Sequence, residues 1–159
     1  MKPITSFFLC LIALGSFSQT KSIQHTLDTW HKAAATADYD TYFSLMTEDA
    51  VFVGSDASEV WTGEAFKTFA KPYFDAEKAW TFFPVNRNVY TEGNFAWFDE
   101  VLNSNHMGLC RGSGVLIRNE DGHWKIKHYV LSLAIPNPLV NKIVKEKKDL
   151  DVTFLKTQN

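Results

Sequence analysis

The sequence is poor in features that mark disulfide-rich, metal-binding and nucleotide-binding proteins. It has two cysteines, and it contains no paired Cys-x-x-Cys, no His-Glu-x-x-His and no glycine-rich phosphate loop. Its formal net charge is only −2, so no general electrostatic attraction to nucleic acid is expected. We therefore expect no cofactor, no metal site and no nucleic-acid partner. With 159 residues, of which 45% are hydrophobic, the chain is expected to form one domain with a packed core.

The N-terminal segment differs in composition from the rest of the chain. Lys2 is its only charged residue, an apolar run covers residues 4–14, and small residues occupy positions −3 and −1 of a cleavage site after Ser18. This pattern predicts a signal peptide, residues 1–18, and a secreted or periplasmic mature protein. The run is short for a membrane span, so no stable membrane insertion of the mature chain is expected. Cleavage leaves Cys110 as the only cysteine, and we interpret it as a small buried hydrophobic residue.

Residues 19–150 are predicted to form a single α+β domain, followed by a flexible C-terminal tail at 151–159. The first helix is indicated by apolar residues at helical spacing, from Ile23 through Leu27 and Trp30 to Ala34. Three helices are predicted in the N-terminal half: one at 22–37, a second that begins after a cap at Asp38, and a third that begins after a cap at Thr62. The predicted strands lie at 50–53, 79–91, 94–103, 107–118 and 123–135. A short helix is predicted near 139–144.

The last two predicted strands form a hairpin across the turn at Asn119–Gly122, where Asp121-Gly122 suits the positive backbone angles of a tight turn. Arg111, His128 and Ser132 are polar residues within these otherwise apolar strands. Strand alternation places His128 and Ser132 on the face that also carries Trp124 and Ile126. We interpret these polar residues as the lining of an internal pocket.

The predicted strand at 95–102 is apolar in both alternate registers. A sheet with one face in water usually alternates apolar and polar residues. Both faces of this sheet are therefore expected to be covered, one by the helices and the other by a second subunit of a homodimer.

The chain resembles the SnoaL-like branch of the nuclear transport factor 2-like (NTF2-like) superfamily over roughly residues 22–140. The resemblance rests on the order and spacing of several segments: Trp30–Ala34 with Asp38, Phe52–Asp56, Glu59–Gly63, Pro72–Phe74, Ala96–Glu100, Arg111–Leu116 and Trp124–Ile126. It implies an NTF2-like cone, in which three N-terminal helices pack on a curved, mostly antiparallel sheet with a pocket at the open end. Members include ketosteroid isomerases, cyclases, epoxide hydrolases, dehydratases and proteins that only bind, so the fold does not determine the function.

Acid–base chemistry in such a pocket has two candidates, Asp99 and His128. An enclosed carboxylate acquires a raised pKa that suits proton abstraction, and histidine titrates near neutral pH. Asp99 and Glu100 are adjacent, so only one of them points into the cone. Arg111 is expected to pair with Asp99 or Glu100, because an unpaired buried charge is costly, and the alternative is that it binds an anionic ligand group. His31 is interpreted as a half-exposed structural histidine.

The candidate ligand-binding residues share a predicted position on the pocket or at its mouth; they are Glu59, Trp61, Tyr73, Trp97, Glu100, Arg111 and Ser132. The leading functional hypothesis is an exported protein that binds a small, partly apolar molecule. A cofactor-free isomerase, cyclase or hydrolase is the first alternative, and a dimerisation or interaction module without catalysis is the second.

Overall fold

The computed structural model describes the backbone of residues 5–158 and the side chains of residues 19–158, and it shows an α+β fold. The elements follow one another as α1 (Thr5–Ala35), α2 (Tyr39–Ser44), β1 (Met46–Val53), β2 (Val60–Thr62), α3 (Gly63–Asp75), β3 (Phe83–Glu92), β4 (Phe95–Ser104), β5 (Gly108–Arg118), β6 (Trp124–Leu133), the short 3-10 helix η1 (Asn137–Leu139) and α4 (Val140–Lys156). The predicted order of elements is confirmed, with β2 as a strand that the sequence pattern did not indicate.

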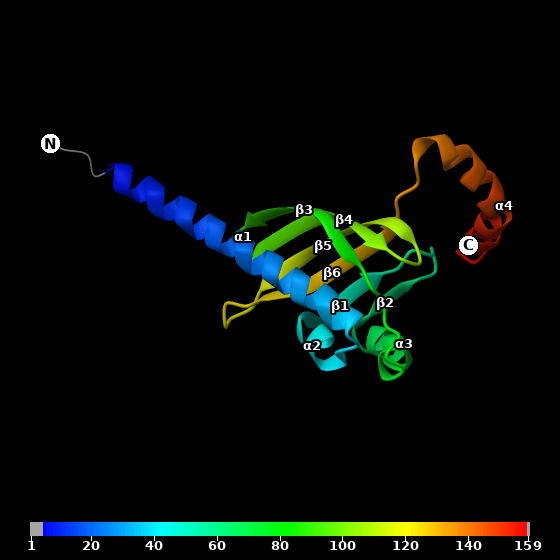
Figure 1. The fold of residues 1–159 in the computed structure, drawn as a ribbon, viewed down its shortest axis with the longest axis horizontal. Coiled ribbons are helices and arrows are strands. Elements are labelled where there is room, and N and C mark those ends of the chain that lie inside the picture. Colours follow the sequence, from blue (N-terminus) through cyan, green and yellow to red (C-terminus); the bar gives the residue numbers. More distant parts are fainter. Residues whose placement is uncertain (1–4, 159) are drawn as a thin grey trace.

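The six strands form one curved sheet in the order β2-β1-β6-β5-β4-β3. All neighbouring pairs are antiparallel except β1 and β6, which are parallel. Helices α1, α2 and α3 pack against one face of the sheet, here called the inner face (Figure 1). The opposite face is called the outer face. The predicted cone of three helices on a mostly antiparallel sheet is therefore confirmed.

The helices form where their sequence patterns predict them, although one of the two predicted caps makes no hydrogen bond with its side chain. The apolar stripe of α1 is buried at Ile23, Leu27 and Trp30. The carboxylate of Asp38 accepts a hydrogen bond of 3.0 Å from the backbone N–H of Thr41, which caps α2 as predicted. Thr62 is the N-cap residue of α3, as predicted, but its side chain makes no capping hydrogen bond.

The N-terminal segment lies in the first half of α1, which extends beyond the edge of the sheet in Figure 1. Residues 1–4 of the predicted signal peptide lie outside the described residues, as do all of its side chains. The cleavage site after Ser18 therefore stays a prediction. Across the described part of the chain, no helix has the length and apolar character needed to cross a membrane.

Strand β6 contains a β-bulge that reverses which of its residues face inward. Leu116 of β5 pairs with Ile126, but the preceding residue Val115 pairs with His128, so Lys127 is an extra residue on β6. Because of this insertion, Ile126 lies on the inner face while His128 lies on the outer face. The prediction that His128 and Ser132 share a face with Trp124 and Ile126 is wrong for this reason.

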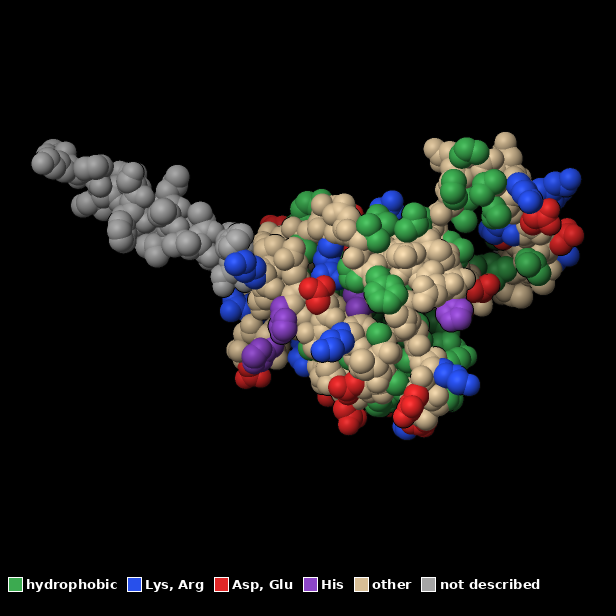
Figure 2. All heavy atoms as spheres, in the orientation of Figure 1, with side chains coloured by type: hydrophobic (Ala, Val, Ile, Leu, Met, Phe, Trp, Pro, Cys, Tyr) green, Lys and Arg blue, Asp and Glu red, His purple; other side chains and the backbone are tan. Residues whose placement is uncertain are grey.

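Helix α4 continues to Lys156, so residues 151–156 of the predicted C-terminal tail are helical. None of its residues is buried. Figure 2 shows hydrophobic side chains on the side of α4 nearer the body of the protein and charged side chains on the other. The helix is therefore amphipathic, and its apolar stripe is only partly covered by its own chain.

Candidate functional site

A pocket of about 170 Å³ opens between the inner face of the sheet and α3. Its wall combines residues from β1, β2, α3, β6, the loop before β3 and the turn after β4. We call it the aromatic pocket, and its lining residues are Phe52, Gly54, Ser55, Glu59, Trp61, Phe66, Phe69, Trp80, Phe82, Met107 and Leu131.

Stacked rings build the wall of the aromatic pocket. The rings of Phe52 on β1 and Phe66 on α3 stack with centroids 4.3 Å apart, and those of Trp61 on β2 and Phe69 on α3 stack at 4.2 Å. Phe66 and Phe69 occupy one face of α3 because they are three residues apart. Such offset ring pairs add about 0.5–1.5 kcal/mol each beyond the burial of their area. The pocket wall is therefore packed into and against the hydrophobic core.

Glu59 is held at the mouth of the aromatic pocket by the loop between β1 and β2. The backbone N–H of Gly54 donates to the carbonyl of Glu59 at 2.8 Å, and the backbone N–H of Asp56 donates to its Oε2 at 3.2 Å. A Cβ atom at Gly54 would clash with the Glu59 side chain, so only glycine allows this close approach. These contacts fix one carboxylate oxygen of Glu59 and leave Oε1 available.

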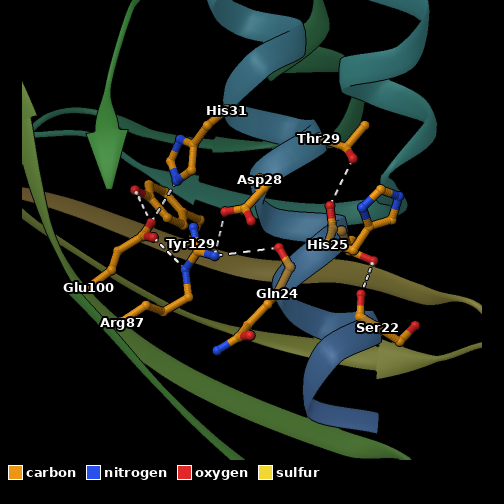
Figure 3. A network of polar contacts seen from close by, with 10 residues as sticks. Ser22, Gln24, His25, Asp28, Thr29, His31, Arg87, Glu100 and Tyr129 are labelled. Carbon is orange, nitrogen blue, oxygen red and sulfur yellow. Dashed lines mark hydrogen bonds and ion pairs between the residues drawn. The ribbon is translucent and has the colours of Figure 1, made fainter. Parts of the chain in front are cut away.

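A second group of polar residues lies behind the pocket wall, here called the Glu100 network (Figure 3). Glu100 is 1% exposed, and its Oε1 lies 2.8 Å from Nε2 of His31 and 3.3 Å from the hydroxyl of Tyr129. Nε of Arg87 donates to Oε2 of Glu100 at 2.8 Å, and Nη1 of Arg87 donates to Asp28 at 2.8 Å. The network therefore ties α1 to β3, β4 and β6 across the inner face.

Hydrogen bonding keeps the Glu100 carboxylate ionised despite its burial. Burial raises the pKa of Glu100, but the hydrogen bonds and charges of His31 and Arg87 outweigh it and hold the pKa below its usual range. Burial and the negative charge of Glu100 raise the pKa of Tyr129, which stays a neutral hydrogen-bond donor. Glu100 is consequently a satisfied structural anion rather than an acid poised to exchange protons near neutral pH.

Two aromatic residues join the Glu100 network to the aromatic pocket. Phe82 lines the pocket and its ring lies 6.5 Å from that of His31. Phe52 also lines the pocket and stacks on Tyr129 at 5.5 Å. The network thus supports the wall of the pocket without lining it. Across the described part of the chain, no cluster of His, Cys, Asp and Glu side chains could hold a metal ion.

The structure brings only some of the predicted site residues together. Glu59 and Trp61 line the aromatic pocket. Tyr73 lies at its edge, where its ring is 5.4 Å from that of Phe69. Glu100 does not line the pocket and is separated from it by the side chains of the pocket wall.

The remaining predicted site residues belong to the outer face of the sheet; they are Trp97, Asp99, Arg111, His128 and Ser132. Asp99 accepts a hydrogen bond of 3.1 Å from Asn88. Nε2 of His128 is buried and has no hydrogen-bond partner among the residues that the structure describes. Ser132 faces a cleft beneath α4. None of these side chains lines the aromatic pocket.

Two interpretations of individual residues are corrected. Arg111 was expected to pair with Asp99 or Glu100, but the partner of Glu100 is Arg87, which lies opposite it on β3. His31 was expected to be half-exposed, but it is 5% exposed and bonded to Glu100. Arg87 was missed because Asn-Arg-Asn at 86–88 is typical of turns, whereas these residues lie inside a strand. No local signal in the sequence could have identified this pairing, because it follows from the register of β3 on β4.

Comparison with known proteins supports the family that the sequence resembles. The model of the SnoaL-like domain matches residues 23–136. A search of curated proteins finds no match. An NTF2-like protein from Streptomyces avermitilis, assigned provisionally as a dehydratase, is 18% identical, covers 76% of this chain and 99% of its own, and has a TM-score of 0.66.

Two further solved structures have the same fold. A protein from Shewanella frigidimarina, assigned provisionally as a ketosteroid isomerase, is 17% identical, covers 70% of this chain and 94% of its own, and has a TM-score of 0.57. An NTF2-like protein of unknown function from Pseudomonas putida is 15% identical, covers 76% and 90%, and has a TM-score of 0.64. At these identities the likeness establishes the fold alone.

Proposed function

Because the chain belongs to the SnoaL-like domain family, in which one fold carries several activities, we propose that it binds a small, partly apolar molecule in the aromatic pocket. The observation that carries this proposal is an open pocket lined mainly by aromatic side chains with one carboxylate at its mouth. Concave apolar sites with a few fixed polar groups are typical of small-molecule binding.

The volume of the aromatic pocket limits the size of the ligand. An engineered cavity of about 150 Å³ in another protein holds one benzene molecule. At about 170 Å³, the aromatic pocket suits a single ring or a compact branched group. Four fused rings of a steroid would not fit without movement of the wall, so the name given to the Shewanella protein is not transferred to this chain.

The lining of the pocket favours binding over acid–base catalysis. Catalysis by an acid and a base requires both groups to reach one substrate position. Among the lining residues that the structure describes, Glu59 is the only acid or base. The catalytic candidates Asp99 and His128 lie on the outer face, so they do not supply the second group.

Binding is tested with neutral one-ring compounds, such as benzyl alcohol and cyclohexanol, by measuring the melting temperature of the protein. A ligand present at about 100 times its Kd stabilises the folded state by about 2.7 kcal/mol, so a clear rise in melting temperature is expected. Met107→Trp is expected to abolish the rise, because Met107 lies at the rim of the pocket and an indole would fill it. Met107→Leu conserves volume and serves as the matched control. An equal rise in wild type and Met107→Trp would contradict the proposed site.

We also propose that the outer face mediates self-association. Trp97 is 45% exposed and stacks on Tyr90, which is 47% exposed, at 5.7 Å. Exposed apolar patches of this kind mark interaction surfaces more often than isolated apolar residues do. A second copy would cover the face of the sheet that α1–α3 leave open.

Light scattering at micromolar concentration is expected to give the mass of a dimer for wild type and of a monomer for Trp97→Glu. The charge would be buried without a partner in the dimer. Tyr73→Glu is the matched control, since Tyr73 is 46% exposed and lies on α3, away from the outer face. A monomeric wild type, or equal loss of the dimer in both variants, would exclude the outer face as the interface.

A further inference from the structure

The formal charge in the described lining of the aromatic pocket is negative. Among the described residues of its lining, Glu59 alone carries a formal charge, and none is Lys, Arg or His. The aromatic pocket shares three lining residues, Gly54, Ser55 and Leu131, with the cleft beneath α4. That cleft adds Asp56, Asp151 and Lys147, of which the last two form an ion pair of 2.9 Å. Among the described residues, the lining of the aromatic pocket therefore carries one carboxylate and no cationic side chain, and the lining of the adjoining cleft adds a net charge of −1, so the local field attracts cations.

The aromatic wall of the pocket also favours a cationic ligand. Six of its lining side chains are aromatic, two of them tryptophans. The face of an aromatic ring carries partial negative charge, and tryptophan attracts cations most strongly. An organic cation loses most of its water in such a pocket, and ring faces together with one carboxylate compensate for that loss. A neutral apolar ligand would form no favourable electrostatic contact with the Glu59 carboxylate.

The position of Glu59 fits this role. Its Oε2 accepts a hydrogen bond from the backbone N–H of Asp56, which orients the carboxylate, and Oε1 has no hydrogen bond among the described residues. Hydrogen bonds from the Ser58 hydroxyl and backbone N–H lower the pKa of Asp56, so the Asp56 carboxylate beside Glu59 stays ionised. The anion at the mouth is thus held in place before any ligand arrives.

We propose that the ligand of the aromatic pocket is a small organic cation, an alkylammonium or quaternary ammonium compound, whose charged group contacts the aromatic wall and Oε1 of Glu59. This inference rests on the proposed function, because it names the chemical class of the molecule that the same pocket binds. The limited volume favours a compact cation with few carbon atoms beyond its methyl groups.

The test compares choline with 3,3-dimethylbutan-1-ol, which has the same shape but carries carbon in place of the charged nitrogen. Isothermal titration calorimetry on the full-length protein is expected to show choline binding about tenfold more tightly or better. Glu59→Gln should reduce this preference to about threefold, since the amide oxygen can still accept the Asp56 N–H and the loop is retained. Glu64→Gln removes the same charge from an exposed site on α3 and is expected to leave the preference unchanged.

The outcomes separate the two proposals. Equal binding of both compounds to wild type would overturn the inference about charge while leaving small-molecule binding in the pocket intact. A choline preference that survives in Glu59→Gln would overturn the role of Glu59. Binding of neither compound, together with no thermal shift from the neutral one-ring compounds, would count against the proposed function itself.

Discussion

Glu100→Ala is expected to lower the free energy of unfolding by about 3–5 kcal/mol, the range typical of removing one partner from a buried ion pair. The substitution leaves the Arg87 guanidinium buried with only the exposed Asp28 as a charged partner. It also removes the hydrogen-bond partner of His31 and of the Tyr129 hydroxyl. Urea unfolding monitored by tryptophan fluorescence would measure the loss.

Asp99 provides the matched control because it is the neighbouring acid on the same strand. Asp99→Ala removes a partly exposed carboxylate on the outer face that accepts one hydrogen bond from Asn88. Its cost is expected to stay below about 1 kcal/mol. Glu100→Gln keeps the volume and part of the hydrogen bonding, so an intermediate loss is expected. Equal losses for Asp99→Ala and Glu100→Ala would mean that the Glu100 network does not hold the elements of the cone together.

The Glu100 network is also expected to make the stability of the fold depend on pH in the acidic range. The pKa of Glu100 is lower in the folded state than in the unfolded chain. Its ionised carboxylate therefore contributes fully to the free energy of unfolding at pH values above the pKa of the unfolded chain. This contribution is lost as the pH falls through the pKa of the folded state. Wild type should therefore lose stability as the pH falls below about 4.5, the ordinary pKa of a glutamate side chain. Glu100→Gln should flatten this part of the profile, and Asp99→Asn should not.

The sequence predicts the architecture of this protein well because local patterns and family motifs agree. The apolar stripe of α1 and the cap at Asp38 fix α1 and α2. The Asp121-Gly122 turn fixes the last hairpin, where Gly122 has the positive φ of 83° that the turn requires. Glu59 and Trp61 could be assigned to the mouth of the cone because they lie between a strand end and a helix start. Such signals depend on neighbours along the chain.

The rest of the site could not be predicted because it depends on strand register. Alternation assigns a face only while a strand has no insertion, and Lys127 inserts one residue in β6. The bulge moves His128 to the outer face and places Tyr129 on the inner face, where its ring stacks on Phe52 in the pocket wall. In the same way, the pairing of Arg87 with Glu100 follows from the register of β3 on β4, which no local pattern specifies.

The bulge itself leads to the second prediction with a large effect, that Gly114→Ala destabilises the fold by about 3 kcal/mol. A Cβ at Gly114 would clash with the backbone carbonyl of His128 and would lie 2.9 Å from Cε1 of Phe98. The carbonyl belongs to the bulged strand and cannot rotate away as a side chain would. Phe98 is itself buried, so the sheet must open at this point. Thermal and urea unfolding would measure the effect.

Gly93→Ala separates this steric effect from the loss of glycine flexibility. Gly93 has φ of 58° and a Cβ there would meet nothing within 4 Å, so its substitution costs only the backbone preference, about 1 kcal/mol. Both variants gain the same rigidity in the unfolded chain. The larger loss at Gly114 would therefore measure the close approach of β5 to the bulge.

A functional consequence distinguishes the two glycines as well. Gly114 lies opposite Tyr129, whose ring stacks on Phe52 in the wall of the aromatic pocket. Opening the sheet at Gly114 should shift that wall and weaken ligand binding about tenfold, which corresponds to a loss of roughly 1.4 kcal/mol in the free energy of binding. Gly93→Ala, at a turn between β3 and β4, should bind as wild type does. If Gly114→Ala bound normally despite its lower stability, the pocket wall would be set by the helices alone and not by the bulge in β6.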